Sequence, residues 1–386
     1  MNKLFLVFTP VFIFYLIYGF YLSQFELKLI GKKLNSNPLQ SSYRMQQNIY
    51  TDLTIGSGKI SDIIDEAKKA STQYIMLTDL NPTSTLENDY YAFNIGVLFG
   101  AKVTNSDYSL TLYSAQNKSY IQQFNFGYNE KNSAETLIIN NYELDKKFYP
   151  AADGFDVINL KNMANRVWSK KKVSTLWSLI FYPFNPKIAL IRLYRDPEEE
   201  LKIFDDLSKI KKTNMYLSTE ATAKALPLAN VLLKFPSYNN TFKIASQRIL
   251  LKSDLKYKME SDQEKILSAL KSGSFYISID AFGDSTGFET FLFDNKTNKY
   301  YFMNDNVRLD KSIELHYKLP FEPNCFYEVV LFKNGERIDY RSVSEGHFKI
   351  LKKGNYRLQV RLNTDLPFPD NNKWLTWIFS NNFYIK

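Results

Sequence analysis

The stretch GSGKISDIIDEAKKASTQYIMLTDLN, residues 56–81, decides the predicted fold. Its first half has helical periodicity, with one apolar face formed by Ile60, Ile63, Ile64 and Ala67. Its second half, residues 73–80, is an apolar run typical of a strand buried on both faces of a parallel sheet. The Gly-Ser-Gly segment before the helix is too short for a P-loop and lacks the Lys-Ser/Thr ending, so we interpret it as a tight turn. The whole stretch predicts a β-α-β unit.

The same alternation continues downstream to about residue 279. Further strands are predicted at residues 95–103, 136–142, 154–160 and 214–220, and a further helix at 197–210. Strands that alternate with helices over this length predict a mostly parallel α/β sheet or barrel, in which chemistry lies at the C-terminal strand ends. The side chains to examine are therefore those of residues 78–81, 100–102, 140–141, 156–159 and 218–222.

Residues 177–195, WSLIFYPFNPKIALIRLYR, form an unusually apolar insertion. We interpret it as core of the predicted barrel. The alternative is a hydrophobic hairpin that rests on a membrane or a partner, which the lysines at 170–172 favour because cations beside an apolar segment suit anionic headgroups.

From about residue 280 the pattern changes to short segments of alternating apolar and polar residues, separated by turns such as Asn334-Gly335. This pattern predicts a small antiparallel β domain, a sandwich of the immunoglobulin-like kind. The predicted organisation is an anchor at 1–26, a polar linker at 27–47, an α/β domain at 48–279 and the β domain at 280–386.

The N-terminal segment carries no charged residue from Leu4 to Gln24 and is about as long as a helix that crosses the bilayer. We expect an uncleaved single-pass transmembrane anchor, because the segment lacks the small-residue site of a cleaved signal peptide. The lysines that follow favour a cytoplasmic location for the rest of the chain, whereas a signal anchor would export it. We place the globular part outside the cytoplasm.

Composition limits the chemistry. The chain has 386 residues and a net charge of +9, but its lysines and arginines lie in scattered clusters such as 170–172 and 209–212. Nucleic acid is therefore an unlikely partner, and a solvated basic surface or attraction to anionic lipid is favoured. The single cysteine, Cys325, excludes an internal disulfide. The only histidines, His316 and His347, lie in the predicted β domain.

Several motifs together resemble the PHP (polymerase and histidinol phosphatase) phosphoesterases. Residues 56–81 are similar to the family's opening segment of glycine turn, helix and T-D-H-N strand end. Downstream, 100–102, 140–141, 154–159 and 218–222 stand where the family has G-x-E, H-P, G-x-E-x-x-N and G-S-D-A-H. The later segments at 235–251, 269–282 and 377–385 resemble a membrane-associated branch with a C-terminal β domain. The resemblance covers most of residues 48–386 and implies a distorted (β/α)7 barrel at 48–279, followed by the β domain.

The resemblance also implies hydrolysis of a phosphate ester by two or three divalent metals. At the family's ligand positions this sequence has Tyr50, Asp52, Leu80, Lys102, Asn140, Glu220 and Thr222. Leucine offers no lone pair, and an ammonium repels a cation. Only Asp52 and Glu220 could bind a metal strongly, and together they would hold one hydrated Mg²⁺ or Ca²⁺ weakly. We therefore expect no metal cofactor, with one weakly bound divalent cation as the alternative.

Lys102 suggests what replaces the metal. If Asp52, Asp79 and Glu220 converge at the strand ends, the ammonium would pair with them in a structural network. The alternative is a pocket in which Lys102 binds an anion such as phosphate. Asp156, in the G-x-E-x-x-N-like motif, is a further degenerate site position. The first functional hypothesis is a non-catalytic, membrane-anchored binding or scaffold protein, a pseudoenzyme with a protein partner in a membrane-associated assembly. The second is a metal-dependent phosphoesterase with a depleted carboxylate site. A third is polyanion or glycan binding by the β domain.

Overall fold

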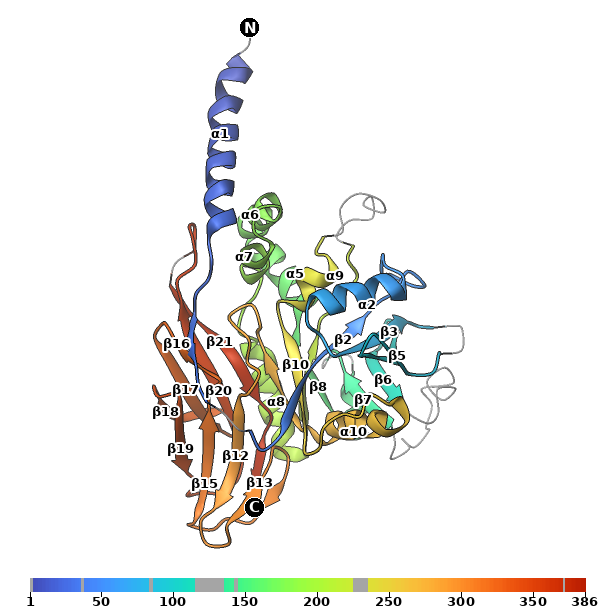
Figure 1. Ribbon diagram of the computed structural model, residues 1–386, viewed down its shortest axis with the longest axis vertical. Coiled ribbons are helices and arrows are strands. Elements are labelled where there is room, and N and C mark those ends of the chain that lie inside the picture. Colours follow the sequence, from blue (N-terminus) through green and yellow to red (C-terminus); the bar gives the residue numbers. More distant parts are fainter. Residues whose placement is uncertain are drawn as a thin grey trace.

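The computed structural model describes residues 3–35, 38–82, 86–114, 135–141, 145–224, 235–370 and 372–386. Its helices are α1 (Lys3–Gln24), α2 (Ile60–Lys69), α5 (Leu160–Lys170), α6 (Lys172–Phe181), α7 (Pro186–Ile191), α8 (Glu198–Ile210), α9 (Tyr238–Phe242) and α10 (Met259–Ser272), with a 3₁₀ turn at Lys146–Phe148. In Figure 1, α1 projects from one end of the molecule, and the other labelled helices lie mainly beside the strands of the first half.

The large sheet runs through both halves of the chain. Its strands from the first half are β2 (Ser41–Ile49), β3 (Tyr74–Leu80), β4 (Tyr90–Ala92), β5 (Ile95–Thr104), β6 (Ser109–Ser114), β7 (Glu135–Ile139), β8 (Gly154–Asn159), β9 (Asn214–Ser218), β10 (Ser246–Leu251) and β11 (Phe275–Ser278). From the second half it takes β14 (Asn306–Val307), β17 (Tyr327–Lys333), β18 (Glu336–Arg341), β20 (Gly354–Thr364), β21 (Lys373–Ser380) and β22 (Phe383–Ile385). The two halves join where β11 pairs with β21.

The predicted strands and helices of the first half are present, but their alternation is not strict. Among the described residues, β2, β3 and β5 are parallel, as are β7, β8 and β9. However, β6 pairs antiparallel with both β5 and β7, and no helix separates β3 from β5 in the described chain. The expected repetition of β/α units is thus interrupted, because a short hairpin and not a helical crossover joins β5 to β6.

The end of β9 returns to β2. Ile49 forms a parallel bridge with Ala221, and the backbone N–H groups of Tyr50 and Ala221 donate to the carbonyls of Ala221 and Asn48. Asn48 and Glu220 both have positive φ, 56° and 49°, a conformation uncommon outside glycine. This contact brings the C-terminal ends of the two strands together. Strand β2 begins at Ser41 and therefore overlaps the segment 27–47 that was predicted as a linker.

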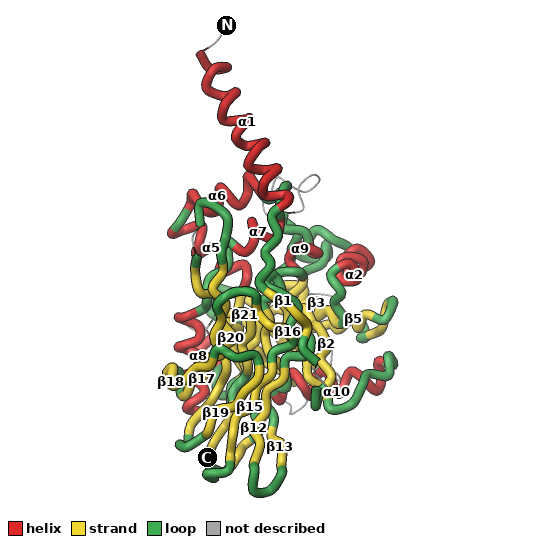
Figure 2. The backbone as a smooth tube through the Cα atoms, turned by 60° about the vertical axis from the view of Figure 1, so that its left-hand side comes forward, coloured by secondary structure: helices red, strands yellow, loops and turns green. Residues whose placement is uncertain are grey.

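The second half adds a separate four-stranded sheet at the end of the molecule opposite α1 (Figure 2). It consists of β12 (Glu289–Asp294), β13 (Lys299–Tyr301), β15 (Ile313–Lys318) and β19 (Glu345–Lys349), while β1 (Ile30–Lys33) pairs with β16 (Phe321–Pro323). Alternating burial along β15 directs Leu315 and Tyr317 inward, where they join the same core cluster as Trp377 of β21. The core is therefore continuous between the two halves.

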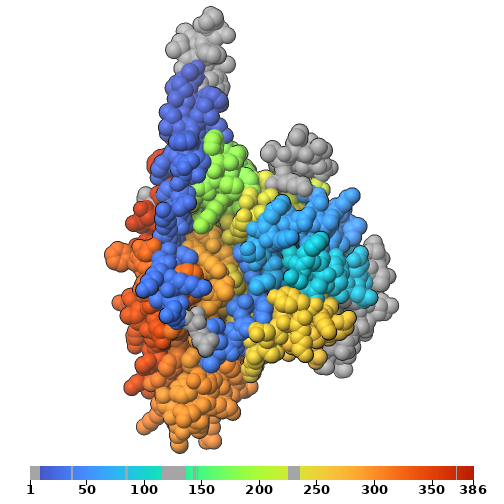
Figure 3. All heavy atoms as spheres, in the orientation of Figure 1, coloured from blue at the N-terminus to red at the C-terminus, as the bar shows by residue number. Residues whose placement is uncertain are grey.

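Residues 177–195 comprise the second half of α6, then α7 and the segment that follows it, and their first part packs against α1. Tyr15 and Tyr18 of α1 contact the ring of Phe181, and Gly19 lies so close to the Phe184 ring that a Cβ there would approach it within 2.5 Å. Figure 3 shows this region (green) against the lower part of α1 (blue). The prediction of core thus holds in part: Ile191 and Tyr194 are buried in the main hydrophobic cluster, whereas the ring of Phe181 packs on α1, about 160 residues away in sequence.

The membrane predictions need correction. Across the residues that the structure describes, no helix is both long enough and apolar enough to cross a membrane. The single-pass anchor at residues 1–26 is therefore contradicted, and so is the extracytoplasmic placement that depended on it. The apolar pattern that suggested the anchor includes a packing face: Asn185 Nδ2 donates to the carbonyls of Leu22 and Phe25 at 2.8 and 3.1 Å, which fixes the end of α1 on α7.

Candidate functional site

A buried ion pair lies where the strand ends meet. The Lys102 ammonium at the end of β5 pairs with Glu220 Oε1 just beyond β9, and the Tyr50 hydroxyl donates to Glu220 Oε2 at 2.8 Å. Lys102 and Glu220 are each 8% exposed and Tyr50 is 1% exposed. Both carboxylate oxygens of Glu220 are therefore engaged by donors of this chain. We call Tyr50, Lys102, Asp156 and Glu220, with the amides around them, the strand-end network.

Three asparagines extend the strand-end network. Asn48 and Asn159 each direct their side-chain amide toward Glu220 Oε1 at 3.5 Å, and Asn159 also donates to Asp156 Oδ2 at 3.1 Å. Asn140 accepts from Thr111 Oγ1 at 2.9 Å. Among the described residues, Asp156 Oδ1 and Asn140 Nδ2 have no hydrogen-bond partner although both are buried. The network thus has unused polar capacity, which is costly unless a ligand or water meets it.

Burial sets the protonation of this network. Desolvation raises the pKa of Asp156 to about 7, with a further contribution from the charge of Glu220, against the lowering effects of Ser218, Lys102 and Asn159. Desolvation and the adjacent Glu220 carboxylate also raise the pKa of Tyr50 well above its ordinary value. Asp156 is therefore largely a neutral acid below pH about 7, and Tyr50 remains a hydrogen-bond donor.

The other candidate ligand residues do not join the pair. Asp79 accepts from the Thr51 N–H at 2.8 Å, from the Thr51 hydroxyl at 2.7 Å and from the Thr54 hydroxyl, so its carboxylate holds the turn after β2. Asp52 is exposed on that turn, and Leu80 and Thr222 are half-buried. The predicted convergence of Asp52, Asp79 and Glu220 on Lys102 is therefore not present. Lys102 pairs with Glu220, and Asp79 holds a local turn.

The Gly-Ser-Gly segment wraps a tyrosine hydroxyl. The N–H groups of Ser57 and Gly58 both donate to the Tyr238 hydroxyl at 3.2 Å, and this hydroxyl donates to the Tyr50 carbonyl at 2.7 Å. A Cβ on Gly56 would approach the Tyr50 carbonyl within 2.1 Å, so the turn requires glycine there. The amides that would cradle a phosphate in a P-loop are thus directed at Tyr238.

Tyr238→Phe tests this turn. The change removes one donor and one acceptor that serve three buried backbone groups, so we expect the free energy of unfolding to fall by about 2 kcal/mol in urea denaturation. Tyr340→Phe, at a ring 53% exposed on β18, is the matched control and should leave the denaturation midpoint unchanged. Equal midpoints for both variants would contradict the structural role given to Tyr238.

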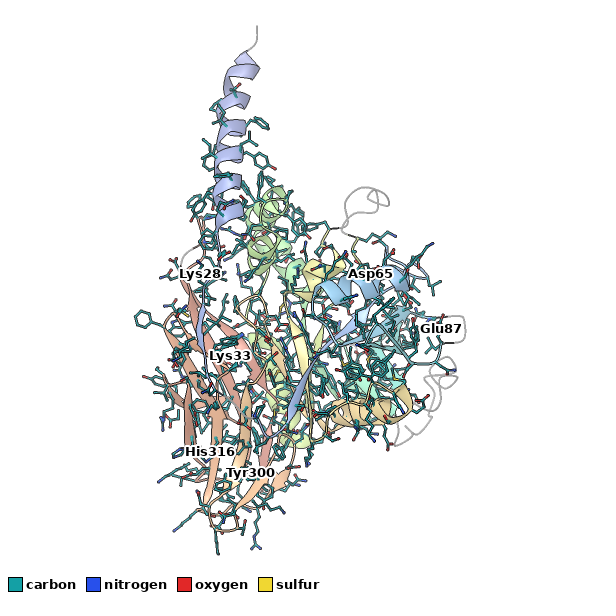
Figure 4. All side chains as sticks on the ribbon, in the orientation of Figure 1. Lys28, Lys33, Asp65, Glu87, Tyr300 and His316 are labelled. Carbon is teal, nitrogen blue, oxygen red and sulfur yellow. The ribbon has the colours of Figure 1, made fainter. Side chains whose placement is uncertain are left out.

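Metal-ligating side chains are dispersed. Within the described ranges, no group of three or more His, Cys, Asp or Glu side chains is placed to hold a metal ion. His316 on β15 and His347 on β19 stack on one another with ring centroids 5.2 Å apart. Figure 4 shows His316 on the second sheet near Tyr300, far from Asp65 on α2. The described donors at the strand ends do not fit the metal cluster that the resemblance implies.

An apolar cavity of about 740 Å³ opens above the strand-end network. Glu220 and Thr222 form part of its floor. Its walls come from α5, α6, α7 and α9, and include Leu160, Met163, Trp168, Thr175, Leu179, Tyr182, Leu190, Leu193, Tyr194, Phe235, Thr241 and Ile244. The volume is in the range of small-molecule sites, which are mostly apolar with a few polar groups. Residues of the predicted strand end at 218–222 and of the apolar insertion at 177–195 thus line one cavity.

Two members of the strand-end network were not among the predicted residues. Asn48 lies two positions before Tyr50, and Thr111 lies on β6, which is antiparallel to its neighbours. Asn48 accepts from the hydroxyls of Thr78 and Thr111, each at 3.3 Å. Asn48 lies at the polar end of β2, SSYRMQQNI, directly after Gln46 and Gln47, so no local signal singles it out, and none identifies Thr111.

Comparisons with known proteins find a distant structural likeness. No family model matches the sequence, and no curated protein matches it. The chain is similar in structure to a two-domain protein from Bacteroides vulgatus described as containing a predicted PHP-like metal-dependent phosphoesterase. The sequence identity is 9% and the TM-score 0.38, over 91% of this chain and 98% of the other. A likeness of this size carries no inference about what this chain binds.

Proposed function

We propose that this chain is a non-catalytic binding protein, a degenerate PHP-like barrel followed by an immunoglobulin-like domain, whose cavity at the strand ends takes a mainly apolar ligand. The observation that carries the proposal is the position of Glu220. This residue lines an apolar cavity, yet Lys102 neutralises its carboxylate and Tyr50 binds the second oxygen. Both oxygens of Glu220 therefore have partners within the chain, and neither is free to coordinate a cation.

The donor set argues against phosphoester hydrolysis. Binding of several divalent ions needs carboxylates or imidazoles that converge with free lone pairs. Here Glu220 is paired, Asp79 is saturated by its own turn, and Asp156 is largely protonated below pH about 7. The ammonium of Lys102 would also repel a cation brought to Glu220. These features support a binding role over the depleted phosphoesterase.

The walls of the cavity support an apolar ligand. The side chains from α5 to α7 are largely aliphatic or aromatic, and Trp168 and Leu179 stay 49% and 41% exposed at its edge. Exposed apolar groups beside a concave apolar surface are a feature of ligand sites. A ligand that binds against these side chains removes their apolar surface from water. Each Å² of apolar surface buried contributes about 25 cal/mol to the free energy of binding.

Ligand binding is tested with N-phenylnaphthylamine, a neutral apolar fluorophore. We expect saturable binding with one site per chain. Leu179→Arg places a charge at the cavity and should weaken binding about tenfold or more, because a cation must then be desolvated beside the ligand. Leu176→Arg, on the same helix at a residue 53% exposed outside the cavity lining, is the control and should bind as the native chain does.

Two outcomes would overturn the proposal. The first is fluorophore binding that both arginine variants weaken equally, since the signal would then come from the general surface. The second is two or more equivalents of manganese, iron or zinc in the purified protein, together with phosphatase activity that Asp52→Ala abolishes. Such a result would establish the metal-dependent phosphoesterase instead.

A further inference from the structure

A second cavity lies at the opposite ends of the same strands. It has a volume of about 690 Å³. Asp153 precedes β8 and Asn214 begins β9, so the cavity is formed at the N-terminal ends of strands whose C-terminal ends carry the strand-end network. The last turn of α10 and the turn at residues 302–305 complete its walls. We call it the lysine cavity because it is lined by Lys211, Lys212, Lys252 and Lys271.

Two of these lysines carry charge that no carboxylate neutralises. Lys212 Nζ donates to the Asn304 carbonyl at 2.5 Å, and Lys252 Nζ lies 5.2 Å from the centroid of the Phe302 ring. Within the described chain, neither forms an ion pair with an acidic side chain. A carbonyl and an aromatic face orient an ammonium without cancelling its charge, so both lysines add positive potential to the cavity.

The acids of the lysine cavity are occupied by backbone groups. Asp153 Oδ2 accepts from the Leu137 N–H at 2.9 Å, and Asp305 Oδ2 accepts from the Phe302 N–H at 2.8 Å. Asp305 does favour the charged form of Lys212, whereas burial, the larger effect, lowers the pKa of that lysine. Among the described lining residues, Lys212 and Lys252 are thus cations without a carboxylate partner, and Asp153 and Asp305 already accept from backbone N–H groups.

The walls are held in place by hydrogen bonds. Asn304, in the left-handed conformation with φ 65°, donates from Nδ2 to the Ser272 carbonyl at 2.8 Å and to Asn214 Oδ1, and its N–H donates to the Asn382 carbonyl at 2.7 Å. These bonds fix the 302–305 turn against α10 and β9. The cations are therefore arranged before a ligand arrives, which lowers the ordering cost of binding.

We propose that the lysine cavity binds a small organic phosphate that carries at least two negative charges. The charge and preorganisation point to an anion, and the volume leaves room for more than a phosphate group. Phe302, half-buried in the wall, offers a ring surface for the organic part. This site is independent of the apolar cavity, which lies at the other ends of β8 and β9.

Calorimetric titration of the full chain with pyrophosphate and with a nucleoside diphosphate tests the proposal. We expect saturable binding of both, tighter for the nucleoside diphosphate, and weaker as salt rises. Lys252→Glu should lower the affinity about tenfold or more, and Lys212→Gln should lower it by a smaller factor. Leu179→Arg at the apolar cavity should leave both affinities unchanged, which separates this site from the proposed function.

Lys349→Glu is the matched control, because Lys349 is an exposed lysine on β19 and the substitution changes the net charge by the same amount as Lys252→Glu. It should bind as the native chain does. The proposal is overturned if neither anion binds, or if Lys349→Glu weakens binding as much as Lys252→Glu, since the overall charge of the protein would then account for the effect. Equal affinity for the two anions would reject the organic part of the ligand.

Discussion

Replacing Lys102 with methionine should lower the free energy of unfolding by about 3–5 kcal/mol, because it leaves the Glu220 carboxylate buried without its counter-charge. Methionine keeps an unbranched side chain of similar length, so packing changes little. Tyr50, Asn48 and Asn159 would still donate toward Glu220, but neutral donors do not replace a full positive charge. Urea denaturation of the full chain at about pH 8 measures the loss.

The double variant Lys102→Met/Glu220→Gln isolates the pair. It removes both charges, so we expect it to recover much of the stability that Lys102→Met loses, and the difference from additivity gives the coupling energy. Lys69→Met is the control: Lys69 pairs with Glu66 at 2.6 Å on the exposed face of α2 and should not affect the midpoint measurably. A loss for Lys102→Met no larger than for Lys69→Met would show that the buried pair contributes nothing.

The local hydrophobic pattern was sufficient to predict most of the strands and helices that position the strand-end network. The apolar run at 73–80 became β3 and the periodic run at 60–70 became α2, with Ile63, Ile64 and Ala67 buried as the helical face predicts. These elements follow from periodicity and burial within a few residues of each other. The predicted strand ends consequently located Lys102 and Glu220 in the correct region, although 118 residues separate them.

Features that depend on distant partners were not visible in the sequence. The aromatic residues of α6 pack on α1, and nothing in residues 177–195 alone distinguishes such a packing surface from barrel core or a membrane hairpin. Similarly, Asp79 was an equal candidate partner for Lys102, but Thr51 and Thr54 engage it through a local turn. Such local hydrogen bonds determine which of several carboxylates is left to pair with a lysine, and they cannot be predicted from residue type alone.

The lysine cavity shows the same limit. The sequence shows a basic cluster at 209–212. That this cluster lines a cavity depends on Lys252, on the 302–305 turn and on α10, which all lie much further along the chain. Scattered lysines in sequence thus became a concave basic surface only through the topology. Composition favours the interpretation that these lysines form a solvated surface. Such a surface would not include a turn fixed by hydrogen bonds, as Asn304 fixes residues 302–305.

The largest pH effect should come from Asp156, which is 2% exposed. Its pKa is about 7 in the folded chain against an ordinary value of 3.8 for aspartic acid, so between these values the folded state retains a proton that the unfolded state has lost. Stability from this group is therefore fully present below about pH 4 and declines as the pH rises through about 7. A shift of this size corresponds to about 4 kcal/mol.

Asp156→Asn should remove that dependence, because the amide resembles the neutral acid. The variant and the native chain should have similar free energies of unfolding near pH 4, and the variant should be more stable by up to about 4 kcal/mol at about pH 8. Asp65→Asn, at an exposed carboxylate on α2, is the control and should follow the native profile at every pH. Urea denaturation across this range measures all three; a constant difference between Asp156→Asn and the native chain would mean that Asp156 is ionised at low pH.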